Sequence, residues 1–121
     1  MSWKSYLKRM WGGLASSQED AVSMPRFAPS PAVRRHMVFE GRVQGVGFRF
    51  EVKQLGKELG LTGWVMNRAG GSVEAEIQGE EEKISFLITY LKSLKRISIQ
   101  SLTMEELPLV PDETDLKVRW E

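Results

Sequence analysis

Apolar and polar residues follow two different periods along the chain after its first third. In two stretches they alternate one by one, which is typical of a strand with one buried face. After each of these stretches, apolar residues recur every three or four positions, which predicts an amphipathic helix. The expected elements are strands at 36–40, 61–67, 73–78, 97–106 and 116–120 and helices at 48–59 and 80–96.

The order strand-helix-strand-strand-helix-strand, with one further edge strand, predicts an α+β fold of the ferredoxin-like, split βαβ type. Residues 34–121 are expected to form one domain, in which two helices cover one face of an antiparallel sheet. The helical period predicts that Glu51 faces solvent and that the basic residues of 92–96 form a solvated helix end. Trp64 and Trp120 are expected to pack in the core or on a face of the sheet.

Residues 1–33 lack the strand pattern. Prolines interrupt a stretch rich in serine and alanine, which indicates a flexible N-terminal extension ahead of the domain. Between Trp3 and Leu14, however, apolar residues share one helical face and basic residues occupy the other. The alternative is therefore a short amphipathic helix that docks on a membrane surface, on a partner or on the domain itself.

Residues 41–49, GRVQGVGFR, combine three glycines with an arginine between the first strand and the first helix of the domain. Glycines allow positive φ and let an anion approach main-chain N–H groups that a Cβ would shield. Arg49 opens the helix, where unpaired N–H groups and the positive end of the helix dipole point at the same spot. We call this stretch the glycine loop. It predicts a phosphate site, and an ordinary tight turn with a surface arginine is the alternative.

Composition narrows the possible functions. The 17 Lys and Arg residues nearly balance 16 Asp and Glu, and at a formal charge of +1 any recognition of an anion must be local. The chain has no cysteine, a single histidine and no cluster at metal-ligand spacing, so no metal site is expected. No apolar run has the length of a membrane span or of a secretion signal, which favours a cytoplasmic protein without membrane insertion.

Asn67 ends the second strand of the domain, and the split βαβ topology brings that end near the glycine loop. A role as a turn former ahead of Gly70 is the alternative. Taken together, GRVQGVGFR and GWVMNRAGGSVEAEIQG, the latter at residues 63–79, resemble the two signature motifs of the acylphosphatase family. The resemblance spans residues 34–121 and leaves the extension outside.

The resemblance implies hydrolysis of a small-molecule acyl phosphate to a carboxylate and inorganic phosphate, by a monomer without metal or cofactor. Arg49 and main-chain N–H groups of the glycine loop would hold the phosphoryl group, and Asn67 would orient the attacking water. Many family members carry an aromatic residue in place of Gly47, so a more mobile loop and a less enclosed acyl pocket are expected. The loop N–H groups in question are those around Gln44, Gly45, Val46, Gly47 and Phe48.

Two other classes of protein share this fold. A non-catalytic acylphosphatase-like module would bind phosphate or carbamoyl phosphate, as such domains do within larger maturation enzymes. RNA-recognition modules stack bases on aromatic residues of their central strands. The predicted strand 73–78 has no aromatic residue and two glutamates, so no nucleic acid is expected as a partner. The identity of the acyl group is left open.

Overall fold

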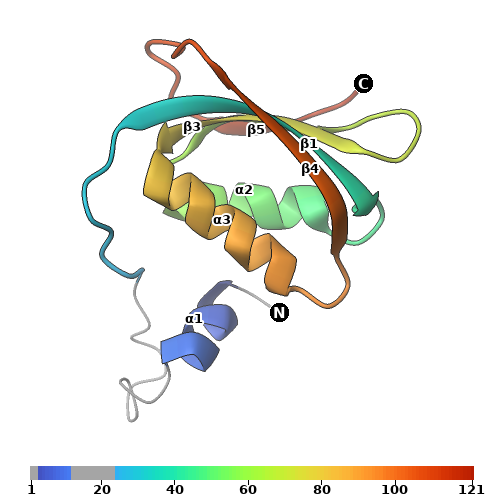
Figure 1. Ribbon diagram of the computed structural model, residues 1–121, viewed down its shortest axis with the longest axis horizontal. Coiled ribbons are helices and arrows are strands. Elements are labelled where there is room, and N and C mark those ends of the chain that lie inside the picture. The colour runs from blue at the N-terminus through green and yellow to red at the C-terminus, as the bar shows by residue number, and fades with distance from the viewer. Residues whose placement is uncertain (1–2, 12–23) are drawn as a thin grey trace.

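The computed structural model describes residues 3–11 and 24–121. These residues form three helices and five strands, coloured from blue to red along the chain in Figure 1. β1 begins before the predicted start of its strand at residue 36. In chain order the elements are α1 (Trp3–Trp11), β1 (Ala32–Arg42), α2 (Phe48–Glu58), β2 (Thr62–Asn67), β3 (Val73–Glu80), α3 (Glu81–Ser93), β4 (Ser98–Leu107) and β5 (Leu116–Arg119).

The five strands form one sheet in the order β4-β1-β3-β2-β5. β3 pairs antiparallel with both β1 and β2, so β1 and β2 run in the same direction and end at the same end of the sheet. β4 pairs antiparallel with β1, and β5 joins the opposite edge parallel to β2. Figure 1 shows α2 and α3 across one face of this sheet. The predicted ferredoxin-like α+β fold, a split βαβ with an extra edge strand, is confirmed.

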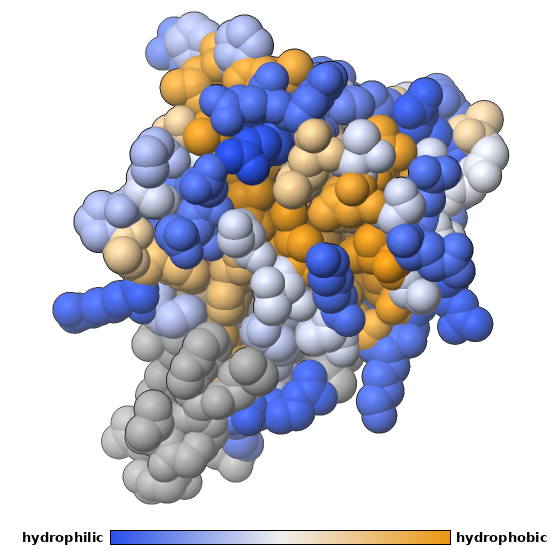
Figure 2. Space-filling model, in the orientation of Figure 1, coloured by the Kyte–Doolittle hydropathy of each residue, from blue (hydrophilic) through white to orange (hydrophobic). Residues whose placement is uncertain are grey.

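The core lies between this face of the sheet and the two helices. Alternate residues of β1 and β3 face inward, as the period of two predicted: Met37 and Phe39 in β1, and Val73, Ala75 and Ile77 in β3, are buried. In the orientation of Figure 1, Figure 2 shows apolar side chains in the middle of the view with hydrophilic ones around them. The helices and their ends contribute Phe48, Val52, Leu55, Leu59, Ile84, Leu87, Tyr90, Leu91 and Leu94.

Helix α1 adds a further layer on the side of α3 that faces away from the sheet (Figure 1). Trp3, Tyr6 and Leu7 of this helix are buried. The ring of Tyr6 meets those of Phe86 and Tyr90 edge-on, with centroid distances of 5.9 and 5.2 Å. α1 thus packs on the domain itself. None of the helices within 3–11 and 24–121 combines the length and the apolarity that crossing a bilayer requires.

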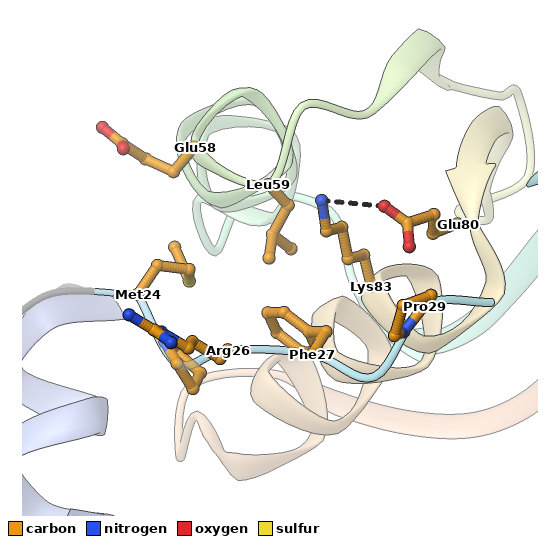
Figure 3. Close-up of a pocket in the computed structure, with 9 residues that line it drawn as sticks. Met24, Arg26, Phe27, Pro29, Glu58, Leu59, Glu80 and Lys83 are labelled. Carbon is orange, nitrogen blue, oxygen red and sulfur yellow. Dashed lines mark ion pairs between the residues drawn. The ribbon is translucent and has the colours of Figure 1, made fainter.

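The segment before β1 follows the ends of α2 and α3. Phe27 packs on Phe86 at a centroid distance of 5.3 Å, and the main-chain N–H of Ser30 donates to Glu80. Figure 3 shows Lys83 paired with Glu80 beside a pocket of ≈ 450 Å³ between this segment and the helix ends. The flexibility of the extension stays a prediction, because residues 1–2 and 12–23 lie outside the described residues.

Candidate active site

The glycine loop has the backbone conformation that its glycines predicted. Gly45 and Gly47 have φ values of 72° and 80°, in the left-handed region that residues with a Cβ rarely adopt. Gly47 is also the N-cap of α2, and no side chain caps that end of the helix. The first N–H groups of α2, beginning at Phe48, therefore have no acceptor within the helix. Because the positive end of the helix dipole lies at the same place, the start of α2 is suited to bind an anion.

Arg49 and Asn67 meet in one pocket of ≈ 380 Å³ beside this loop. Arg49 comes from the first turn of α2, and Asn67 from the end of β2. Since β1 and β2 end at the same end of the sheet, the topology brings the two sequence motifs together. The pocket is lined by Val43, Gly45, Gly47, Phe48, Arg49, Phe50, Lys53, Asn67, Val118 and Trp120.

Two polar atoms in this pocket are buried without a partner. Within the described part of the chain, neither Nη1 of Arg49 nor Oδ1 of Asn67 makes a hydrogen bond. An unsatisfied buried polar group costs about 1–3 kcal/mol, so a ligand that pairs with both atoms gains that free energy on binding. The two atoms require opposite partners. Arg49 can only donate, which suits a phosphoryl oxygen, whereas Oδ1 of Asn67 accepts, which suits a water molecule.

Trp120 lies against the guanidinium of Arg49. The Cζ atom of Arg49 is 4.5 Å from the centroid of the indole, within the range of a cation–π contact. Trp120 is 77% exposed, so the expectation that it packs in the core or on the sheet is wrong. Its position follows from strand pairing. Met66 pairs with Arg119 in the parallel β2–β5 register, and this brings together the residues that follow them, Asn67 and Trp120. Trp120 therefore forms an outer wall of the pocket near Asn67.

Not every residue of the predicted phosphate site lines the pocket. Gly45, Gly47 and Phe48 do, whereas the side chains of Gln44 and Val46 are absent from its wall. The Nε2 of Gln44 instead donates to the carbonyl oxygens of Arg68 and Ser72, at 2.7 and 2.8 Å. This amide ties the glycine loop to the turn between β2 and β3, and so holds the loop in register with the end of β2.

The buried carboxylate of Glu51 and the guanidinium of Arg96 support the glycine loop from outside the pocket. Glu51 is only 4% exposed, so the prediction that it faces solvent is wrong. Its carboxylate accepts a 2.7 Å hydrogen bond from the hydroxyl of Tyr90 and forms an ion pair with Arg96. Arg96 also donates from Nε to the carbonyl oxygen of Val46, at 2.8 Å. The basic residues of 92–96 are thus more than the solvated helix end that the sequence predicted.

The protonation of Tyr90 suits its role as a donor in this network. Burial raises the pKa of Tyr90, and the adjacent carboxylate of Glu51 raises it further. The hydroxyl therefore keeps its proton at neutral pH and donates it to Glu51. The positive charge of Arg96 acts in the opposite direction on the same pKa and does not reverse the shift.

Five residues of the pocket wall were not predicted as part of the site: Val43, Phe50, Lys53, Val118 and Trp120. Lys53 had a usable signal, because it follows Arg49 by four positions and so shares its helix face. For Val118 and Trp120 the sequence offers no such signal. They reach the pocket only because β5 pairs parallel to β2. That pairing joins segments far apart along the chain, and no local pattern encodes it.

Comparison with known proteins shows which family this chain resembles. The acylphosphatase family model matches residues 35–118. An acylphosphatase from Geobacillus thermodenitrificans is 38% identical over 88 residues, which cover 72% of this chain and 94% of that protein. A solved acylphosphatase structure from Coxiella burnetii is 36% identical with a TM-score of 0.65, and the match covers 73% of this chain and 93% of that one.

A larger protein contains a similar domain. The structure of full-length HypF in its phosphate- and nucleotide-bound form is 29% identical with a TM-score of 0.66, and the match covers 78% of this chain but 12% of that one. The family model runs from β1 into β5 and so includes every residue of the pocket wall except Trp120. The chain belongs to the acylphosphatase family.

Proposed function

We propose that this protein hydrolyses acyl phosphates to a carboxylate and inorganic phosphate. The observation that carries the proposal is the pair of unpartnered buried atoms, Nη1 of Arg49 and Oδ1 of Asn67, in one pocket at the start of α2. One atom suits a phosphoryl oxygen and the other suits the attacking water. Membership of the acylphosphatase family supports the same activity.

In this proposal the glycine loop binds the phosphoryl group. Main-chain N–H groups between Gln44 and Phe48 donate to its oxygens, and the guanidinium of Arg49 adds a charged fork that can contact two oxygens at once. The left-handed glycines let the loop adopt this conformation, and the uncapped start of α2 leaves its first N–H groups available as donors. Preorganised donors of this kind stabilise the charge on the phosphoryl oxygens in the transition state.

Asn67 orients the nucleophile. Its Oδ1 accepts a hydrogen bond from a water molecule, whose oxygen then attacks the phosphorus atom. The bond from phosphorus to the acyl oxygen breaks, and this oxygen leaves with the bonding electrons as a carboxylate. The proton of the water passes to a phosphoryl oxygen of the substrate. Because a carboxylate is a good leaving group, the scheme requires positioning and electrostatics but no protein acid, no metal and no cofactor.

The acyl end of the substrate lies against an apolar wall. Phe50 and Trp120 line the pocket beside Arg49, yet they are 62% and 77% exposed to solvent. Large exposed apolar side chains at the mouth of a pocket are typical of a surface that a ligand covers. Gly47 contributes no side chain, so these two residues form the wall. Acyl groups with an aromatic or branched apolar part are therefore expected to react more efficiently than acetyl phosphate.

A non-catalytic module that binds phosphate or carbamoyl phosphate is the second candidate. The similarity to one part of HypF, whose structure holds phosphate and a nucleotide, favours it. Both candidates need the glycine loop and Arg49, but only hydrolysis needs a water oriented by Asn67. The cytoplasmic location and the monomeric state stay predictions from the sequence.

The test is the release of inorganic phosphate from benzoyl phosphate by the full chain in the presence of a metal chelator. Wild type is expected to turn over, and Arg49→Ala is expected to lose at least about a hundredfold in kcat/KM while remaining folded. Lys57→Ala is the matched control, since it removes an exposed cation from the far end of the same helix. A folded Arg49→Ala protein with the turnover of Lys57→Ala would exclude the proposed role. A wild type that binds phosphate without turnover would favour the second candidate.

A further inference from the structure

Arg96 does not line the pocket, yet it holds one atom of the glycine loop. We propose that Arg96 is a positioning residue: by binding the carbonyl oxygen of Val46, it aims the N–H of Gly47 at the phosphoryl group, while Glu51 and Tyr90 hold Arg96 in place. This inference rests on the proposed function of the site. It assigns a role to a network that lies outside both sequence motifs.

The first step of the argument is the geometry of one peptide bond. The carbonyl of Val46 and the N–H of Gly47 belong to the same planar trans unit, so they point in opposite directions. The carbonyl points at Nε of Arg96, at 2.8 Å. The N–H therefore points away from Arg96. Because Gly47 lines the pocket, we infer that this N–H faces it.

The peptide unit needs such a restraint. It lies between Gly45 and Gly47, both in the left-handed region, and glycines allow the chain more conformational freedom than any other residue. Without a partner for the Val46 carbonyl, the unit could rotate and turn the carbonyl dipole toward the phosphoryl oxygens. A preorganised N–H donor would then be replaced by a repulsive acceptor.

Arg96 is itself held by Glu51. Its Nη2 pairs with one carboxylate oxygen of Glu51, and the other oxygen accepts the hydroxyl of Tyr90 at 2.7 Å. Glu51 is 4% exposed and Tyr90 is fully buried, so water does not compete for the bond between these two residues, whereas the side chain of Arg96 is 39% exposed. The guanidinium fork reaches the carboxylate and the carbonyl at the same time, which a single ammonium group would do less well.

Arg96 has a second, separable effect through charge. Glu51 lies on the first turn of α2, close to where the phosphoryl group would bind. A buried carboxylate there would repel the substrate, and leaving it without its cationic partner would also destabilise the fold. The ion pair with Arg96 removes both penalties. A variant of Arg96 alone therefore mixes the loss of loop positioning with the exposure of an unpaired charge.

The experiment separates the two effects with a mutant cycle on the full chain. The variants are Arg96→Met, which keeps the apolar stem, Glu51→Gln, which removes the charge at constant size, and the double variant. Lys95→Met is the matched control, because it removes the neighbouring exposed cation. For each protein one measures Tm, kcat for benzoyl phosphate, and the binding of inorganic phosphate by titration calorimetry, all well below the lowest Tm.

Arg96→Met is expected to lower Tm, to lower kcat by at least about tenfold, and to weaken phosphate binding. In the double variant Tm is expected to recover, because no unpaired carboxylate remains, while kcat stays low because the Val46 carbonyl is still free. Lys95→Met is expected to behave as wild type. A double variant with wild-type kcat would overturn the proposal, as would an Arg96→Met protein that matches Lys95→Met. If wild type itself shows no turnover, the proposed function fails. The role of Arg96 is then tested by phosphate binding alone, and binding by Arg96→Met as tight as that by wild type would refute it.

Discussion

The indole of Trp120 covers the guanidinium of Arg49, with 4.5 Å between the Cζ atom of Arg49 and the ring centroid. This contact restricts the side chain that is proposed to hold the phosphoryl group. Trp120→Ala is expected to lower kcat/KM for benzoyl phosphate roughly 3- to 30-fold, the equivalent of a cation–π contact, and Trp120→Phe is expected to lose less. Trp64 offers the control, since its ring makes the same kind of contact with Arg119 at 4.9 Å but lies outside the pocket. Equal losses of activity in Trp120→Ala and Trp64→Ala would contradict this role.

Gly47 and Gly60 lie just before and just after α2, and both are left-handed, with φ of 80° and 74°. Replacing either by alanine is expected to cost about 1–2 kcal/mol of unfolding free energy for the backbone conformation alone. A Cβ on Gly60 would meet nothing within 4 Å, whereas one on Gly47 would lie 3.6 Å from Nε and Nη2 of Arg96. Both are ordinary or absent contacts, so neither Cβ clashes. Only Gly47→Ala is expected to lower kcat as well, because only Gly47 belongs to the loop that is proposed to bind the phosphoryl group. Urea unfolding and turnover measured on both variants check this, and the same loss of kcat in Gly60→Ala would refute it.

The docking of α1 on α3 is open to a direct stability test. Tyr6 is 4% exposed and meets Phe86 and Tyr90 edge-on. Tyr6→Ala is therefore expected to lower the free energy of unfolding by about 2–4 kcal/mol, as for other truncations of large buried side chains. Lys4→Ala, on the exposed face of the same helix, is the control: it removes a cation–π contact with Trp3 at 5.6 Å and should change the free energy of unfolding by at most about 1 kcal/mol. A Tyr6→Ala protein as stable as the control would show that α1 does not contribute to the fold.

Acid is expected to weaken the fold through Glu113. Burial raises the pKa of this carboxyl, but hydrogen bonds with Arg34 and Thr62 and the charges of Arg34 and Arg119 together outweigh burial and hold the pKa below its ordinary value of 4.5. The folded state therefore binds the proton less tightly than the unfolded state does. The stabilisation is present above pH 4.5 and is lost as the pH falls through the lower, folded-state pKa. Arg34 is buried and donates to Glu113 at 2.8 Å, and this charge-assisted hydrogen bond is lost when Glu113 becomes protonated or the chain unfolds.

Urea unfolding midpoints of wild type and Glu113→Gln, measured from about pH 6 down to about pH 3, test this linkage. The wild-type midpoint is expected to fall with the pH over this range. The variant should start lower and fall less, because it has no carboxylate to protonate at that position. Parallel curves for the two proteins would mean that other carboxyl groups carry the acid sensitivity.

The parts of the fold that depend on local period were predictable. Alternation placed Met37 and Phe39 in the core, and the helical stripes predicted α2 and α3, because burial of one face is recorded directly in the order of residues. The meeting of Arg49 with Asn67 was also accessible, since the split βαβ topology alone brings the ends of β1 and β2 to one end of the sheet.

What the sequence did not predict depends on partners far away along the chain. Glu51 lies next to the apolar stripe of α2, and its burial is understood only once Tyr90 and Arg96 are seen beside it. A charged residue at such a boundary is solvated by default, and only a long-range ion pair reverses that. Trp120 was misplaced for a similar reason, because its contact with Arg49 requires the parallel pairing of β5 with β2.

The most direct test of the central claim is the hydrolysis of benzoyl phosphate by Asn67→Ala, measured together with its inhibition by inorganic phosphate. In the proposed mechanism, hydrolysis needs Asn67 and the binding of phosphate does not. We expect kcat to fall at least about a hundredfold while the inhibition constant for phosphate changes little, because the loop and Arg49 are intact. A folded Asn67→Ala protein that keeps near-wild-type kcat would contradict the proposed mechanism.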